Sequence, residues 1–230
     1  MTVGVLVFPG SNCDWDTVHA LEDLKTECRT IWYTETDLRG LDRVILPGGF
    51  AYGDYLRSGA LAAHAPVMAA LERRVAETAL PVLGICNGFQ ILCERGLLPG
   101  ALRNNASGQF RCSLETVRVT AAHPLFPGLA AGTLLRLPIA HHEGSYTVPP
   151  GGLGALFEQQ QVFLQYADAD GVVQAYANPN GSVANIAGVS RGSVVGLMPH
   201  PERAMESYLG SADGRRLLSS WLEGGMRHGA

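Results

Sequence analysis

Short apolar runs that end in glycine or proline constrain the fold of this chain more than any other feature. The runs VGVLVF (residues 3–8), RVIL (43–46) and PVLGI (81–85) are followed at once by PG, PGG and CNG. Such nearly continuous apolar runs are typical of parallel strands buried on both faces, each followed by a tight loop. A fourth short strand is expected at Thr30–Tyr33.

Segments with helical spacing separate these strands. A helix is expected from about Asp14, a second over Leu61–Thr78 and a short third over Gly88–Arg95. A closing helix carries Leu217, Leu218, Trp221 and Leu222. Strand and helix in alternation predict an α/β fold with a doubly wound, mostly parallel sheet flanked by helices.

The pattern changes after Gly100, where expected strands follow one another without helices between them. An antiparallel extension is therefore predicted, with strands at residues 114–119, 134–137, 162–166, 172–176 and 185–189. Val148–Gln161 is the best loop candidate, and Ser193–Met198 is a last apolar strand. We expect residues 1–230 to form a single domain.

Composition excludes several classes of function. The 230 residues carry 17 Lys and Arg against 21 Asp and Glu, a net charge of −4, which argues against nucleic acid as a partner. No apolar run approaches the roughly 18 residues that span a bilayer, and no basic segment precedes the first apolar run. We therefore expect no membrane association and a cytoplasmic location.

The numbers and positions of cysteine and lysine residues argue against three kinds of site: disulfides, metal sites and ATP-binding P-loops. Five cysteines, an odd number with no C-x-x-C pair, argue against a disulfide framework or a zinc site, so no metal is expected. Lys25 is the only lysine and lacks a phosphate-loop context, so the chain is not expected to hold ATP in a P-loop.

Gly84-Ile85-Cys86-Asn87-Gly88 is the sharpest chemical motif. It has the form G-x-S-x-G with cysteine in place of serine, between an expected strand and an expected helix. In such an elbow the turn admits only glycine at the flanking positions, and a helix N-terminus favours the thiolate. The alternative is that Cys86 is an ordinary buried thiol.

A nucleophilic thiol needs a base and an orienting group. His200 and Glu202 follow an expected strand and are separated by one proline, so their side chains can point the same way. The other histidines are rival bases. His19 and His64 fall in helical stretches and His228 in the tail, whereas His123 is not set aside and His141 and His142, which follow an expected strand, remain in play. Backbone N–H groups of Asn87 and Gly49 are the candidate oxyanion donors.

Taken together, PGGF, GICNGFQ and MPHPE resemble the class I (triad) glutamine amidotransferases. The motifs FPGSNCD (residues 8–14), LPGGFAYGDYLRSGA (46–60), PVLGICNGFQIL (81–92) and GLMPHPERA (196–204) are similar to those of glutaminase subunits of phosphoribosylformylglycinamidine synthase. The resemblance covers about residues 3–221 and implies the class I amidotransferase fold, which is flavodoxin-like. It departs in IAHHEGSY (139–146), where His142 and Ser145 replace glycine and asparagine of the family pattern.

The resemblance implies a Cys86, His200 and Glu202 triad, with Gln90 in the glutamine-binding region. Glutamine would be hydrolysed to glutamate and ammonia, and the ammonia passed to a synthetase subunit that acts with a small accessory subunit in purine biosynthesis. That partner, with ATP and Mg²⁺, would convert formylglycinamide ribonucleotide into its amidine, and this chain would bind no cofactor. A stand-alone cysteine hydrolase, a non-catalytic binding relative and an amidotransferase with another acceptor are the alternatives.

Overall fold

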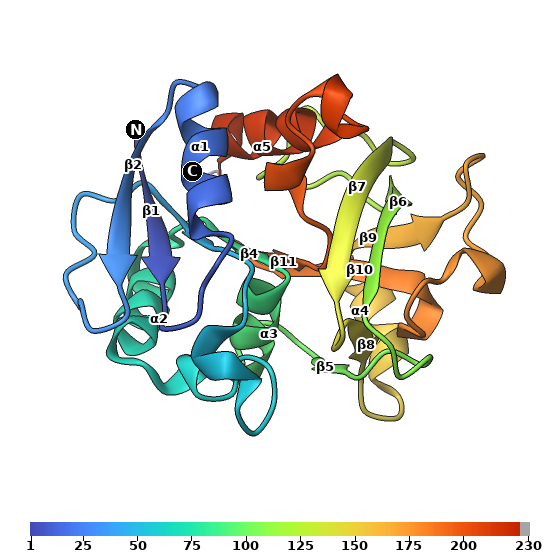
Figure 1. Cartoon of the computed structure of the whole chain (residues 1–230), viewed down its shortest axis with the longest axis horizontal. Helices are drawn as coiled ribbons and strands as arrows, with labels where there is room; N and C mark the ends of the chain where they lie inside the picture. Colours follow the sequence, from blue (N-terminus) through green and yellow to red (C-terminus); the bar gives the residue numbers. More distant parts are fainter. Residues whose placement is uncertain (226–230) are drawn as a thin grey trace. The chain divides into compact units, whose positions relative to one another are not determined.

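The computed structural model describes residues 1–225, and its chain divides into two compact units. The first unit consists of Met1–Leu98 and Arg191–Gly196, and the second of Pro99–Ser190 and Leu197–Ala230. Figure 1 labels helices and strands of both units. Because the expected single domain runs to residue 230, its last five residues lie outside the described part.

A parallel sheet forms the centre of the first unit. Its strands, in the order β2-β1-β3-β4-β11, are β2 (Glu27–Trp32), β1 (Thr2–Val7), β3 (Arg43–Leu46), β4 (Val82–Ile85) and β11 (Val194–Leu197), the last residue of which belongs to the second unit. The pairs β1–β2, β1–β3 and β3–β4 are all parallel. Every residue of β3 and β4 is buried, as the continuous apolar runs predict.

Helices α1 (Asp14–Asp23), α2 (Pro66–Thr78) and α3 (Asn87–Glu94) flank this sheet (Figure 1). The expected start of the second helix at Leu61 is wrong. Ala62–His64 form a short 3₁₀ turn, and α2 begins only at Pro66. Proline excludes the helical conformation from the residue before it, and Ala65 accordingly has an extended ψ of 149°.

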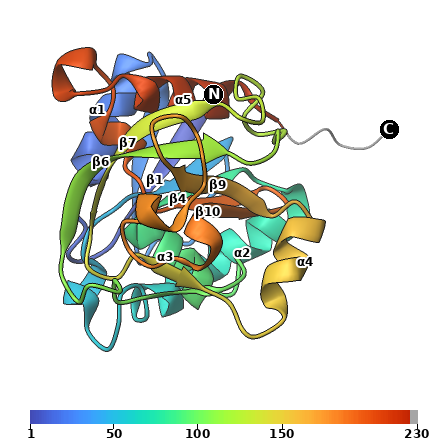
Figure 2. The ribbon, with the colours of Figure 1, turned by 90° about the vertical axis from the view of Figure 1, so that its right-hand side faces the viewer.

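The second unit is built on antiparallel strands, so the predicted α/β class with an antiparallel extension is confirmed. One group, in the order β10-β9-β6-β7, comprises β10 (Ile186–Arg191), β9 (Val162–Ala167), β6 (Arg111–Val119) and β7 (Leu134–His141). A separate pair joins β5 (Ala101–Arg103) to β8 (Ser145–Thr147). Helix α5 (Asp213–Glu223) is the last helix of residues 1–225 and carries the four expected apolar residues, of which Leu217, Leu218 and Trp221 are buried and Leu222 is half-buried. Figure 2 shows α4 (Gly152–Glu158) beside these strands.

Two further expectations for the second unit are wrong. Residues 172–176 form no strand, because the Asp168 carboxylate accepts the backbone N–H groups of Asp170 and Val172 and closes a turn there; a 3₁₀ turn follows at Ala175–Ala177. The expected loop 148–161 contains α4, which begins after Gly151, a glycine with a φ of 81°.

Aromatic side chains make up part of the second unit's core. Phe126 and Phe163 stack with ring centroids 4.4 Å apart, and the ring of His123 lies 5.9 Å from each. Nδ1 of His123 accepts the backbone N–H of Leu125, and burial lowers the pKa of His123 to about 4. Neutral His123 is therefore part of the folded state. Through residue 225, no helix has both the length and the apolar character needed to cross a membrane.

We expect the free energy of unfolding to fall as the pH drops from about 6.5 toward 4. The folded pKa of His123 lies below its unfolded value, so the unfolded state binds the extra proton in that window. By pH 5 the loss from this group is on the order of 2 kcal/mol relative to pH 7. Urea unfolding at the two pH values should show a smaller loss for His123→Asn than for wild type.

The control is His19→Asn, because His19 is exposed on α1. It should keep the wild-type pH dependence. A pH dependence that His123→Asn leaves intact would assign the effect to other groups.

Candidate active site

Cys86 occupies a strained turn between β4 and α3. Its φ of 49° and ψ of −104° lie in a region that side-chain-bearing residues rarely adopt, and it is the N-cap of α3. The thiol is 5% exposed, and the first-turn N–H groups of the helix favour negative charge beside them. The expected strand–turn–helix geometry of a nucleophile elbow is therefore present.

The two glycines of the elbow are required by close packing. A Cβ on Gly88 would lie 2.0 Å from the carbonyl oxygen of Leu46 on β3, and one on Gly84 would lie 2.8 Å from the backbone of Gly88. Contacts this short leave no space for a methyl group. Helix α3 thus approaches the sheet backbone to backbone, and Cys86 must turn sharply to enter it.

Gly49 lies in the loop that follows β3, with a φ of 144°. It forms an isolated bridge with Ser11, and a Cβ on it would lie 2.8 Å from the backbone nitrogen of Asn12. The backbone N–H of Cys13 donates to Gly48 O over 3.3 Å. The loop is therefore held against the segment after β1 with its backbone accessible for close approach.

The side chain of Asn87 joins this loop to α3. Its Oδ1 accepts the Ala51 backbone N–H over 3.1 Å, and its Nδ2 donates to Gln90 Oε1 over 2.9 Å. Within the first unit, Asn87 thus links Gln90 to the loop that carries Gly49. Sequence reasoning assigned Asn87 only its backbone N–H and missed this side-chain bridge, since its partner at position 51 is 36 residues away.

His200 and Glu202 form a buried pair in the second unit. His200 Nδ1 and Glu202 Oε1 are 2.6 Å apart, and the two side chains are 2% and 0% exposed. Because a carboxylate only accepts, it holds the proton on Nδ1 and leaves Nε2 as the ring atom with the basic lone pair. This pairing of imidazole and carboxylate is the one expected from the spacing.

Two backbone contacts hold this turn in place. The His200 N–H donates to Pro138 O on β7 over 2.7 Å. Gly214 of α5 lies so near that a Cβ there would be 1.9 Å from Pro201 O. Pro201 itself opens a 3₁₀ turn, Pro201–Arg203, that carries Glu202 back beside the imidazole.

His141 and His142, the rival bases, have other surroundings. Nδ1 of His141 lies 3.1 Å from Asn105 Oδ1, and that oxygen also accepts the Gly144 N–H. Burial, with a smaller effect from His200, lowers the pKa of His141 to about 4. His142 is exposed and contacts Gly108 O over 3.3 Å. Among residues 1–225, neither has a carboxylate partner like that of His200, so His200 is the better candidate.

The chain is similar to known glutamine amidotransferases along nearly its whole length. Residues 1–223 match the CobB/CobQ-like glutamine amidotransferase domain. The phosphoribosylformylglycinamidine synthase subunit PurQ of Thermomicrobium roseum is 56% identical over 230 residues, covering 98% of this chain and 97% of the relative. The corresponding subunit of Moorella thermoacetica is 49% identical over the full length of both chains.

Solved structures of glutamine amidotransferases have the same fold. A chain in the structure of PurLQS from Thermotoga maritima is 40% identical with a TM-score of 0.85, covering 96% of this chain and 97% of that one. A glutamine amidotransferase from Thermotoga maritima, 16% identical with a TM-score of 0.61, shares the fold. The elbow, the imidazole–carboxylate pair and these matches define a glutamine amidotransferase. Within that class, the chain belongs to the family of PurQ subunits of phosphoribosylformylglycinamidine synthase.

The packing at the elbow leads to a prediction for Gly88→Ala. The added methyl group collides with Leu46 O, so we expect urea unfolding to show about 1–3 kcal/mol lower stability. Glutamate release should fall with it, because Cys86 and Asn87 move together with α3. Gly154→Ala on α4 is the matched control: its Cβ meets open space, so stability should stay within about 0.5 kcal/mol of wild type or rise. A Gly88→Ala protein as stable and active as that control would contradict the requirement for glycine at position 88.

Proposed function

We propose that the chain is the glutaminase subunit of a phosphoribosylformylglycinamidine synthase and that Cys86 is its nucleophile. The strained Cys86 elbow at the start of α3 carries the proposal, in a chain 56% identical to a PurQ subunit along nearly its whole length. The reaction converts glutamine and water into glutamate and ammonia. Residues 1–230 would act as one amidotransferase domain.

The first half of the reaction forms a thioester. Cys86 Sγ attacks the side-chain amide carbon of glutamine, and the developing oxyanion is met by the N–H groups of Asn87 and Gly49. His200 Nε2 takes the thiol proton and returns it to the leaving nitrogen, which departs as ammonia. Glu202 keeps the imidazole in the required tautomer by accepting the N–H of Nδ1.

Hydrolysis completes the cycle. His200 takes a proton from water, the water oxygen attacks the thioester carbon, and the proton returns to the sulfur as glutamate leaves. Gln90, held by Asn87, contributes to the glutamine-binding surface. The proposal requires Cys86 Sγ and His200 Nε2 to come within hydrogen-bond reach in the working enzyme.

The ammonia acceptor belongs to a partner. In this proposal a synthetase subunit, with a small accessory subunit, binds ATP and Mg²⁺ and makes formylglycinamidine ribonucleotide, a step of purine biosynthesis. The chain's single lysine, Lys25, lies outside any P-loop motif, which supports this division of labour. Five free cysteines, Cys13, Cys28, Cys86, Cys93 and Cys112, suit the reducing cytoplasm.

Glutamate release tests the proposal directly. With synthetase and accessory subunits, ATP and formylglycinamide ribonucleotide present, release should rise by about tenfold or more, equivalent to roughly 1.4 kcal/mol of coupling. Cys86→Ala should abolish release but still permit amidine formation when ammonia is supplied. Cys93→Ala, which removes another buried thiol from α3, is the control and should retain activity. Equal glutamate release with and without the partners would favour a stand-alone hydrolase. If no glutamate were released under any condition, the chain would be a non-catalytic relative.

The roles of His200 and Glu202 lead to graded losses. His200→Ala should lower the rate of glutamate release by roughly 10²–10⁴-fold, because it removes the general base. Glu202→Gln should cost less, because it disturbs only the orientation and charge of the imidazole. His142→Ala is the control expected to remain active. If His200→Ala matched wild type, the base would have to be sought at His141.

A further inference from the structure

Strand β6 is paired unequally along its two edges. On one edge β7 pairs with it over the whole stretch from Arg111 to Arg118. On the other edge β9 pairs only with residues 116–119, starting at Thr116 opposite Ala167. Within residues 1–225, no strand pairs with the second edge of residues 111–115, which we call the open edge.

Alternation along the strand identifies the backbone groups that face the open edge. Val119 N–H donates to Thr133 O on the β7 side, and Thr120 N–H donates to Phe163 O on the β9 side. In an antiparallel sheet successive residues alternate between the two neighbours, so even-numbered residues of β6 face the β9 side. The N–H and C=O groups of Cys112 and Leu114 therefore point out of the open edge, whereas those of Ser113 face β7.

A fixed turn explains why β9 leaves the edge open. Asp168 Oδ1 accepts the N–H groups of Asp170 and Val172 over 3.1 and 2.8 Å, and Oδ2 accepts the hydroxyl of Tyr176. The Asp168 N–H also donates to Val172 O over 3.0 Å. These bonds turn the chain away directly after Ala167 and make a pre-organised wall.

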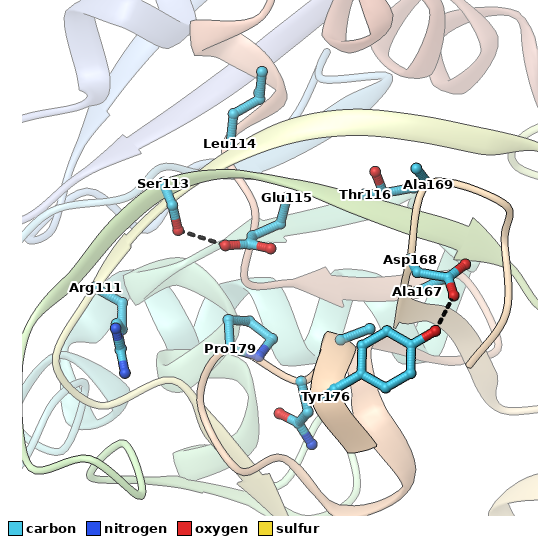
Figure 3. Close-up of a pocket in the computed structure, with 12 residues that line it drawn as sticks. Arg111, Ser113, Leu114, Glu115, Thr116, Ala167, Asp168, Ala169, Tyr176 and Pro179 are labelled. Carbon is cyan, nitrogen blue, oxygen red and sulfur yellow. Dashed lines mark hydrogen bonds between the residues drawn. The ribbon is translucent and has the colours of Figure 1, made fainter. Parts of the chain in front are cut away.

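A cavity of about 460 Å³ lies between this wall and the open edge. It is lined by Arg111 and residues 113–116 of β6, by residues 167–169 and by residues 176–179. Figure 3 shows Ser113 and Glu115 joined on one side, Tyr176 bonded to Asp168 on the other, and Leu114 pointing away. The cavity is thus a groove with one wall of strand backbone.

Charges and aromatic rings mark this groove as a protein-binding surface. Glu115, which accepts the Ser113 hydroxyl over 2.5 Å, and Arg111 give it one acidic and one basic position on the same face of β6. Tyr176 lines it with 77% of its surface exposed, and Phe110, which directly precedes Arg111 in the chain, is 48% exposed. Exposed aromatic residues beside unpaired strand groups are typical of sites where a chain is added to a sheet.

We propose that the open edge of β6 receives an extended segment of the synthetase partner, which pairs as a strand with Cys112 and Leu114. Charge complementarity assigns that segment a Lys or Arg side chain for Glu115 and an acidic side chain for Arg111. The segment enters a groove whose far wall is already formed, so little ordering opposes docking. This inference rests on the proposed function, which supplies the partner.

Hydrogen exchange of the assembled complex tests the pairing residue by residue. In the free chain the amides of Cys112 and Leu114 should exchange quickly, whereas that of Ser113 is already protected by β7. On assembly with the synthetase and accessory subunits, Cys112 and Leu114 should become protected. Assembly without such protection would overturn this inference and leave the proposed function intact, while failure of the wild-type chain to bind would overturn both.

Variants test the same edge by affinity. Cys112→Pro removes an outward N–H without touching the β7 ladder and should weaken binding about tenfold, whereas Cys112→Ala keeps the N–H and should bind as wild type. Glu115→Arg should weaken binding, and Glu158→Arg on α4 is its charge-matched control. Glutamate release without partners should be unchanged in all four. If both Cys112→Pro and Glu115→Arg bound the partner with wild-type affinity, the proposal would be overturned. It would also be overturned if the amides of Cys112 and Leu114 became protected in the chain alone as its concentration rose, and that result would assign the edge to a second copy.

Discussion

The contact between Gly88 and the Leu46 carbonyl is the constraint on which the Cys86 turn in the first unit depends. Since a Cβ at Gly88 would lie 2.0 Å from that oxygen, α3 can touch β3 only through bare backbone. The chain then has one residue, Cys86, in which to pass from strand to helix, and that residue takes a φ of 49°. Strain at Cys86 is thus the consequence of close packing, and it places the sulfur where the helix N-terminus favours a negative charge.

Strands β1, β3, β4 and β11 could be predicted from sequence because burial on both faces leaves a local mark. Strand β2, most of whose residues are exposed, lies at Glu27–Trp32 rather than at the expected Thr30–Tyr33. Continuous apolar runs closed by glycine or proline need no knowledge of distant partners. Val172–Tyr176 carries a similar apolar pattern, yet the Asp168 carboxylate captures the backbone N–H groups of Asp170 and Val172. The hydrogen bonds to the Asp168 side chain therefore outweighed strand propensity, and apolar spacing alone does not predict such side-chain-to-backbone bonds.

The site shows the same division between local and distant information. The elbow and the His-Pro-Glu spacing lie within a few residues each, so their geometry follows from local rules. Asn87 bonds a residue 36 positions away, and His141 meets Asn105, also 36 positions away. Those contacts hold the loop after β3 and the ring of His141, whose burial lowers its pKa to about 4, and they depend on folding that periodicity does not describe.

The turn that carries His200 bonds to β7, and β7 is the strand that pairs with β6, which has the proposed docking edge. Leu114, which faces the open edge of β6, stands opposite Pro138 on β7, and the Pro138 carbonyl accepts the N–H of His200. Pro138 lacks an N–H, but at this register the backbone N–H and C=O positions of Leu114 and Pro138 point away from each other. The proline therefore removes no hydrogen bond between β6 and β7. A strand added at Leu114 would thus extend the sheet that holds the backbone of His200. Docking would then stabilise the backbone anchor of His200, the proposed general base, and glutamine hydrolysis would follow assembly without any residue of the partner entering the site.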